Sequence, residues 1–224
     1  MRIFKLSPSD LTFLWDECPR CFYLKVVMGI SRPSMPFPGI FSNIDSLMKG
    51  MFNEKRTEDL LPQLPPGRFG PMGKWVESSP IRSGGDASCY IKGIYDSLIC
   101  FDDGSFAVMD FKTSQPSKHH VEFYGRQLAA YAYALEHPIP GKEPLGSVTR
   151  LGLLCVEPID FARDEHERIH YVGDVTWMEV PKDEAKFLDF IDQVMQVLSL
   201  PEPPPPAEKC GFCKYRADAR EHGW

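Results

Sequence analysis

Four stretches of the chain carry apolar residues at the spacing of an amphipathic helix. In the first, Ser7 is typical of an N-cap, Pro8 of the first helical position and Asp10 of the first turn. A helix is therefore predicted from Ser7 to Cys18. The other three predicted helices span residues 41–53, 119–136 and 182–198.

Residues that favour β-strands dominate four further stretches. Asp102-Asp103-Gly104 is typical of a tight turn, so strands 89–100 and 105–113 are predicted to pair as a hairpin. Two more strands are predicted at 149–156 and 169–180, and the Pro- and Gly-rich residues 62–74 predict a surface loop. The order of helix, hairpin, helix, two strands and helix predicts an α/β fold.

The length of 224 residues suits one medium-sized domain over residues 1–200. The tract PEPPPP at 201–206 predicts a stiff spacer, and residues 201–224 form this spacer and a cysteine-bearing tail. Neither a signal peptide nor an apolar run of about 18 residues is found, which predicts a cytoplasmic protein. The 25 basic and 31 acidic residues give a net charge of −6, so charge alone does not indicate nucleic-acid binding.

Two carboxylates and a lysine fall on the predicted hairpin. Side chains alternate along a strand, so Asp110 and Lys112 project from one face, and Asp96 approaches them from the neighbouring strand. A hard divalent cation such as Mg²⁺ favours one or two carboxylates and keeps several waters. The pattern predicts a hydrolytic metal site, with a cross-strand salt bridge as the alternative.

Two C-x-x-C pairs lie at opposite ends of the chain, Cys18–Cys21 and Cys210–Cys213. This spacing lets both thiolates of a pair bind one metal centre, and four thiolates complete a tetrahedral site for Zn²⁺ or anchor an iron–sulfur cluster. Such a centre would hold the tail against the first helix. Cysteines 89, 100 and 155 lie in predicted strands and are interpreted as small core residues.

Four motifs, in this order, resemble the signature of the RecB-like nucleases of the PD-(D/E)XK superfamily. These nucleases include the AddB C-terminal domain and the CRISPR-associated RecB-like exonucleases. The motifs are LSPSDLTFLWDECPRCFYLKV near the start, Gly93-x-x-Asp96, Asp110-Phe111-Lys112-Thr113, and Gln127-x-x-x-Tyr131. The resemblance runs from about Leu6 to Cys213 and implies a restriction-endonuclease-like core, with a mixed central sheet flanked by helices.

The resemblance also implies roles for residues. Asp96, Asp110 and the backbone carbonyl of Phe111 would bind Mg²⁺ or Mn²⁺, and Lys112 would be the catalytic lysine. The active site would also include Gln127 and Tyr131, which are four residues apart and share a helix face. For Tyr131 a core position is an equal alternative, because it also lies on the apolar stripe.

The chain departs from the family at one metal ligand. The family has a histidine in a G-x-x-x-H context, but no histidine precedes position 119 here. Gly39 plus four residues gives Asn43, and Asp45 lies two residues further on. We take Asp45 as the tentative replacement, and Asn43 as the weaker one; otherwise the site is one ligand short.

The family often carries a [4Fe–4S] cluster on one early and three late cysteines, whereas this chain has two and two. We therefore expect a [4Fe–4S] cluster on the four cysteines, with Zn²⁺ as the alternative. The implied function is a metal-dependent DNA nuclease that prefers single-stranded DNA or DNA ends. The alternative is a catalytically silent DNA-binding module, or an accessory subunit of a helicase–nuclease or CRISPR adaptation complex.

Overall fold

A computed structural model describes residues 2–34, 36, 38–82 and 87–223. Its strands form one mixed sheet in the order β1-β4-β5-β6-β7, and β2 and β3 also pair with β4. The pairs β1–β4 and β5–β6 are parallel, and the others are antiparallel. The strands are β1 (Arg2–Leu6), β2 (Gly67–Glu77), β3 (Ile81–Arg82), β4 (Ala87–Phe101), β5 (Phe106–Lys112), β6 (Val148–Arg163) and β7 (Ile169–Val180).

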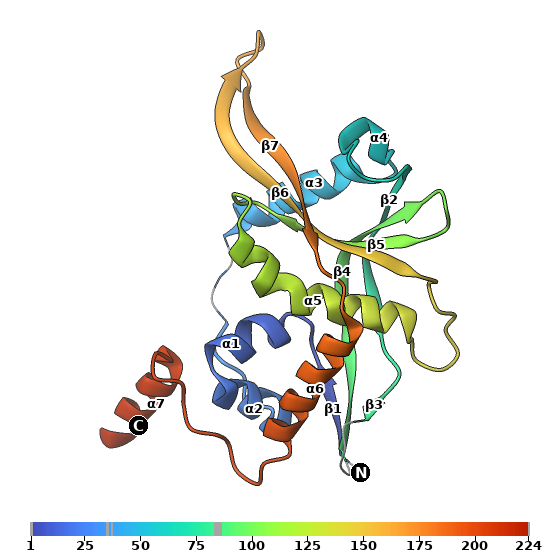
Figure 1. The fold of residues 1–224 in the computed structure, drawn as a ribbon. Coiled ribbons are helices and arrows are strands. Elements are labelled where there is room, and N and C mark those ends of the chain that lie inside the picture. Colours follow the sequence, from blue (N-terminus) through green and yellow to red (C-terminus); the bar gives the residue numbers. More distant parts are fainter. Residues whose placement is uncertain (1, 35, 37, 83–86, 224) are drawn as a thin grey trace.

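Helices lie on both faces of this sheet (Figure 1). They are a π-helix, η1 (Asp10–Leu14), and the α-helices α1 (Trp15–Glu17), α2 (Pro19–Met28), α3 (Gly39–Phe52), α4 (Thr57–Leu60), α5 (Lys118–Glu136), α6 (Glu184–Leu198) and α7 (Gly211–Glu221). A mixed sheet flanked by helices confirms the predicted fold class.

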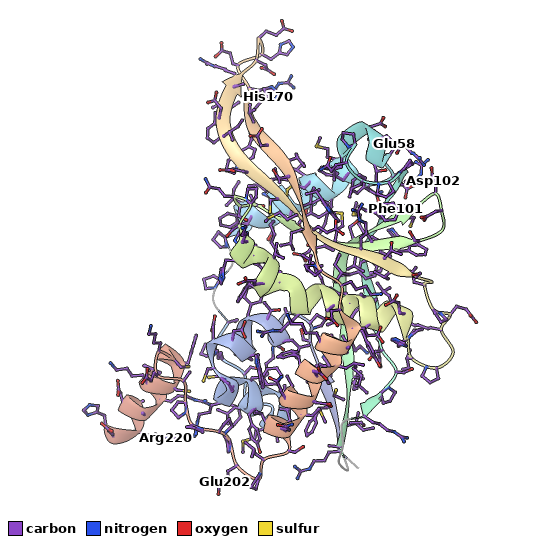
Figure 2. The ribbon with its side chains drawn as sticks, viewed as in Figure 1. Glu58, Phe101, Asp102, His170, Glu202 and Arg220 are labelled. Atoms are coloured by element: carbon purple, nitrogen blue, oxygen red, sulfur yellow. The ribbon has the colours of Figure 1, made fainter. Side chains whose placement is uncertain are left out.

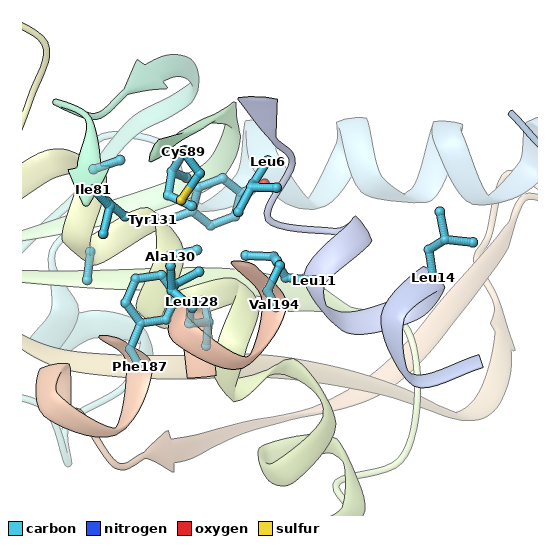
Figure 3. Close-up of a cluster of buried hydrophobic side chains, with 14 of the residues drawn as sticks. Leu6, Leu11, Leu14, Ile81, Cys89, Leu128, Ala130, Tyr131, Phe187 and Val194 are labelled. Carbon is cyan, nitrogen blue, oxygen red and sulfur yellow. The ribbon is translucent and has the colours of Figure 1, made fainter. Parts of the chain in front are cut away.

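Each face of the sheet has its own hydrophobic core. On one face, η1, α2, α5 and α6 pack against β1, β4, β5 and β6, and Figure 3 shows part of this cluster around Leu11, Leu128 and Val194. On the other face, Met48 and Phe52 of α3 pack against the sheet with Phe69. Burial of apolar surface on both sides holds the middle strands rigidly, which is what a site built on them requires.

Most predicted elements are confirmed, with small shifts at their ends. Strand β4 pairs antiparallel with β5, and Gly104, with a φ of 84°, makes the turn between them. Helix α5 begins after Ser117, whose side chain accepts a hydrogen bond from the backbone N–H of His119. Helix α6 begins after Asp183, which caps it through the N–H of Lys186.

The predicted helix from Ser7 to Cys18 is wrong only at its start, over residues 7–9. The chain first forms β1, which pairs with β4, and the helical region begins with η1 at Asp10. The Ser7 hydroxyl contacts that of Ser9, and no side chain caps η1. Residues 2–6 become a strand because a partner strand, distant in sequence, supplies their hydrogen bonds.

The predicted surface loop at 62–74 is also wrong, because β2 begins at Gly67. Its register with β4 shifts between Phe69 and Met72, around a cis peptide bond before Pro71. A Cβ on Gly67 would lie 2.7 Å from the carbonyl oxygen of Cys100. The glycine that favours a loop by composition is therefore needed here for close pairing of two strands.

Two parts of the chain project from the body. Strands β6 and β7 continue beyond the sheet as a long arm, with His170 near its tip, and the tail helix α7 carries Arg220 away from the other helices (Figures 1 and 2). The described residues of α7 include none that is buried. Within the described part of the chain, no helix is long and apolar enough to cross a membrane.

Candidate active site and cysteine centre

The sheet places Asp110 and Lys112 on the face that α5 covers. Their neighbours Met109 and Phe111 belong to the opposite core, so alternation along β5 turns the carboxylate and the ammonium towards α5. The two charged groups form a direct ion pair. Asp110 and Lys112 therefore share one face of β5, as predicted.

Asp96 lies where β4 and β5 part. The last pair of the ladder is Ser97 with Met109, one residue from each aspartate. Beyond it, the Asp96 Oδ2 atom accepts a hydrogen bond of 3.2 Å from the backbone N–H of Phe111. The diverging strands thus bring the Asp96 carboxylate to the same end of β5 as Asp110.

The Asp110 carboxylate is buried, with only 4% of the residue exposed. Its Oδ1 atom accepts a hydrogen bond of 3.3 Å from Gln127 of α5, and its Oδ2 atom makes the ion pair with Lys112. Burial and the nearby Asp96 charge raise the pKa of Asp110 to about 7, against the opposing effect of Lys112. A buried carboxylate with such a raised pKa is typical of functional sites.

Lys112 is held by two contacts. Its Nζ atom pairs with Asp110 and lies 3.8 Å from the centre of the Tyr124 ring, a cation–π distance. Burial lowers the pKa of Lys112, but the Asp110 charge outweighs this effect and raises it. Lys112 is therefore a fixed positive charge beside the two aspartates. The sequence analysis does not identify Tyr124, which belongs to the apolar stripe of the predicted helix at 119–136.

Gln127 and Tyr131 both face the sheet but make different contacts. Gln127 contacts Asp110, whereas the Tyr131 hydroxyl donates a 2.6 Å hydrogen bond to the backbone carbonyl of Ile94. The Tyr131 ring is buried in the core, and burial raises its pKa. Tyr131 thus packs in the core and also holds β4 two residues before Asp96.

The structure explains why the first residue of the G-x-x-D motif, Gly93, is a glycine. A Cβ at this position would lie 2.8 Å from Cδ of Pro8 and 3.3 Å from Cε1 of Tyr131. The backbone of β4 approaches both rings because no side chain intervenes. The motif residues Gly93 and Tyr131 are therefore joined by packing as well as by order in the chain.

Helix α3 contributes Lys49, which the sequence analysis does not identify. The Lys49 Nζ atom lies 2.9 Å from Asp45 Oδ2 and 2.9 Å from Asp96 Oδ1. Burial lowers the pKa of Lys49, but the two carboxylates outweigh it and raise the pKa. Asp45 thus reaches the site through Lys49, whereas Asn43 lies exposed on α3. The i,i+4 spacing of Asp45 and Lys49 is the sequence signal that could have pointed to this pair.

These charged groups face one open cavity of about 630 Å³. Helix α3, the ends of β4 and β5, and the start of α5 line it; among the lining residues are Phe41, Asp45, Lys49, Asp96, Lys112, His120 and Tyr124. The Nδ1 atom of His120 is buried and has no hydrogen-bond partner within the described part of the chain. The cavity can admit a phosphodiester group to the carboxylates.

The donors at this site fit a hard divalent cation. The carboxylates of Asp96 and Asp110 and the carbonyl of Phe111 are oxygen ligands of the kind that Mg²⁺ and Mn²⁺ prefer. The buried Asp110 Oδ2 atom has an ion pair but no hydrogen bond from the described residues. Over the described residues, however, the acidic groups here do not gather as tightly as the four cysteines do.

The cysteine pairs come together although almost 190 residues separate them. The ligand atoms of Cys18, Cys21, Cys210 and Cys213 all lie within 4.8 Å of one another. The Cys21–Cys213 sulfurs are 3.6 Å apart, and the Cys18–Cys213 sulfurs 3.8 Å. A tetrahedral ion with metal–sulfur bonds of about 2.3 Å has sulfurs about 3.8 Å apart. The predicted grouping of the four thiols is therefore present and suits a bound metal.

Local contacts lower the pKa of one thiol at this centre, that of Cys18, whereas burial raises the pKa of Cys21 and of Cys213. Burial opposes ionisation of Cys18, but hydrogen bonds from the backbone of Ala207 and Cys21 lower its pKa to about 7. The Arg32 guanidinium lies 3.5 Å from the Cys210 sulfur and stacks over the Phe212 ring. Of the three other cysteines, those at 89 and 155 are buried and that at 100 is half-buried.

Fold and geometry together define a class of protein: an α/β domain with two carboxylates and a lysine at the end of two strands of a mixed sheet. Residues 47–217 match the family model described as "PD-(D/E)XK nuclease superfamily". The chain therefore belongs to the PD-(D/E)XK nuclease superfamily. Membership indicates a metal-dependent nuclease that acts on nucleic acid.

A solved structure shows the same fold. The crystal structure of SSO0001 is similar with a TM-score of 0.51 at 18% sequence identity, over 95% of this chain and 84% of that one. No curated protein matches the chain.

Proposed function

We propose that the protein is a deoxyribonuclease that hydrolyses phosphodiester bonds with Mg²⁺ or Mn²⁺, preferring single-stranded DNA or DNA ends. The observation that carries the proposal is the buried Asp110 carboxylate, paired with Lys112 and adjoined by Asp96, at the edge of the 630 Å³ cavity. An arrangement of two carboxylates and a lysine with room for a phosphate is suited to this hydrolysis.

We assign the roles as follows. Asp96, Asp110 and the Phe111 carbonyl would hold the metal, which when bound would polarise the phosphate and lower the pKa of a water. Lys112 orients that water and offsets the negative charge that develops on the phosphate. Gln127 holds Oδ1 of Asp110 and Lys112 pairs with Oδ2, so both oxygens of this carboxylate are kept in place.

The preference for unpaired DNA rests on the family resemblance and on the lining of the cavity. The rings of Phe41 and Tyr124 lie beside the charged groups. Aromatic rings can stack on unpaired bases, with about 1–3 kcal/mol for each base. Single strands and frayed ends offer such bases beside the backbone that is cut.

Substitution of the centre tests the proposal. Asp110→Ala and Lys112→Ala should each abolish cleavage of end-labelled single-stranded DNA in Mn²⁺, while circular dichroism shows an unchanged fold. Purified variants that cut as fast as the wild type would refute the assignment. Double-stranded DNA, with and without free ends, and RNA of the same sequence serve as comparison substrates.

A second candidate is a catalytically silent DNA-binding module, or an accessory subunit of a helicase–nuclease or CRISPR adaptation complex. The observation in its favour is that Lys49 occupies Asp96 Oδ1 and that no histidine stands at the family's ligand position. In the same assay, retention of labelled DNA without products, in either Mg²⁺ or Mn²⁺, would support this candidate.

The four cysteines form the second site, and we propose that they hold a structural metal. The sulfur spacing of 3.6–3.8 Å suits a single Zn²⁺ ion, whereas the family resemblance favours a [4Fe–4S] cluster, in which each thiolate binds a different iron. A brown protein with absorbance near 400 nm would identify the cluster. Colourless protein with one zinc for each chain would identify the ion.

We further propose the division into a nuclease domain of residues 1–200 and a tail of residues 201–224, which the cysteine centre attaches to residues 1–30. The exposed α7 supports this division. We also propose a cytoplasmic location. All seven cysteines are free thiols in the structure, which agrees with a reducing compartment.

A further inference from the structure

The candidate metal site lies on the β-hairpin of β4 and β5, and Lys49 reaches it from outside that hairpin. It lies on α3, one turn after Asp45, and its ammonium group sits between Asp45 and Asp96 at 2.9 Å from each. All three side chains line the same cavity. The side chain of Lys49 is 24% exposed, so the ammonium has a path to solvent.

The oxygen that Lys49 contacts is the one that a metal would need. Asp96 Oδ2 is already held by the N–H of Phe111, and Asp96 Oδ1 is held by Lys49. A cation bound by Asp96 beside the Phe111 carbonyl would approach Oδ1. Two positive charges cannot share this position, so metal and ammonium compete for one atom.

The charges of the cavity agree with such an exchange. Asp45 and Asp96 both contact Lys49, whereas Asp110 contacts Lys112. Without a cation between them, Asp45 and Asp96 would face one another uncompensated. The long, flexible lysine stem allows the ammonium to fill this position and to leave it.

We propose that Lys49 is an internal cation that occupies the Asp96 ligand position and is displaced when a divalent metal binds. This inference rests on the proposed metal centre. Lys49 thereby sets the metal affinity of the site and holds α3 against β4 while no metal is bound. After displacement, Asp45 is free to become a further ligand, and the ammonium remains beside the cavity that admits the phosphate.

A metal-binding titration tests the exchange without measuring activity. The protein, with its cysteine centre loaded, is titrated with Mn²⁺ by isothermal calorimetry and by electron paramagnetic resonance of free Mn²⁺. Lys49→Met removes the ammonium but keeps the length of the side chain. It should bind Mn²⁺ roughly 2- to 5-fold more tightly than the wild type, since an exposed ion pair contributes up to about 1 kcal/mol.

Matched controls isolate the position of the charge. Lys49→Arg keeps a cation at this position and should bind Mn²⁺ no more tightly than the wild type. Lys182→Met removes a comparable pair, in which Lys182 contacts Glu136 at 2.8 Å far from the cavity, and should leave the Mn²⁺ affinity unchanged. Circular dichroism of each metal-free variant checks that the fold is kept.

The outcomes are distinct. Equal or weaker Mn²⁺ binding by folded Lys49→Met would overturn the exchange, and weaker binding would make Lys49 a positioning residue for Asp96. If the Mn²⁺ affinity of the wild type does not respond to Asp110→Asn, the proposed metal centre itself fails. If neither the wild type nor Lys49→Met binds Mn²⁺, both proposals fail. Binding by Lys49→Met alone would support the exchange in its strongest form.

Discussion

The two candidate metal sites of this protein differ in how far they are assembled without metal. The four cysteine sulfurs already lie within 4.8 Å of one another. The aspartates are instead paired with lysines, with Lys49 between Asp45 and Asp96 and Lys112 against Asp110. A structural site is closed by protein ligands, whereas a catalytic site keeps a position open for water and substrate. The contrast therefore agrees with one site that holds the fold and one that performs chemistry.

The cysteine centre should respond most strongly to loss of a ligand. Cys21→Ser should lower the free energy of unfolding by on the order of 5 kcal/mol, because a metal bound here would join Cys21 to Cys210 and so close a very long loop. It should also expose the proline tract at 201–206 to limited proteolysis. Urea denaturation followed by circular dichroism measures the first effect.

Cys100→Ser is the matched control for the cysteine centre. Its sulfur is half-buried and contacts the Gly70 carbonyl, outside both sites, so a loss below about 1 kcal/mol is expected. Equal losses in the two variants would mean that Cys21 has no special role. Omission of Mg²⁺ and Mn²⁺ from the buffer, by contrast, should leave the unfolding curve of the wild type almost unchanged.

Gly93 tests whether the aspartate site depends on packing behind it. Gly93→Ala should lose roughly 1–3 kcal/mol of stability, because the new Cβ meets Pro8 at 2.8 Å, and cleavage should fall by roughly 10- to 100-fold as β4 moves. Gly50→Ala on α3 meets nothing within 4 Å and should be neutral or slightly stabilising. Wild-type cleavage by Gly93→Ala would separate the motif glycine from the site.

Tyr131→Phe should have the smallest effect on stability and cleavage, and Tyr23→Phe is its matched control. Tyr131→Phe removes the hydrogen bond to the Ile94 carbonyl and should cost about 1 kcal/mol of stability and a few-fold in cleavage rate. Tyr23→Phe removes a similar bond of 2.9 Å to the Leu200 carbonyl, beside the cysteine centre. It should cost the same stability without any change in cleavage. Equal cleavage rates for the two variants would make Tyr131 only a core residue.

Local pattern was sufficient to predict a large part of this structure. The hairpin that carries Asp96 and Asp110 follows from strand-forming residues on either side of a D-D-G turn, and the helix that carries Gln127 follows from its apolar period. Each of these signals is carried by neighbouring residues within one segment of the chain. Strands β1, β2 and β3 were not predicted, because each depends on pairing with β4 rather than on its own composition.

The candidate site shows the same division. Asp96, Asp110 and Lys112 were found through the order of four motifs, and the structure brings their side chains together at one end of β5. Tyr124 and Lys49 were not found. Each is an ordinary residue of an amphipathic helix until the helix is placed on the sheet, since neither belongs to a motif.

By itself, the sequence determined which residue types could do chemistry here: two aspartates and a lysine on one hairpin, and two C-x-x-C pairs that each suit a metal. These follow from strand alternation and ligand spacing, which are local rules. Only the tertiary structure decided that the cysteine pairs meet, that Asp110 is buried, and that Lys49 stands at Asp96. Such facts depend on contacts between segments far apart in the chain, which packing of both sheet faces settles and no local pattern encodes.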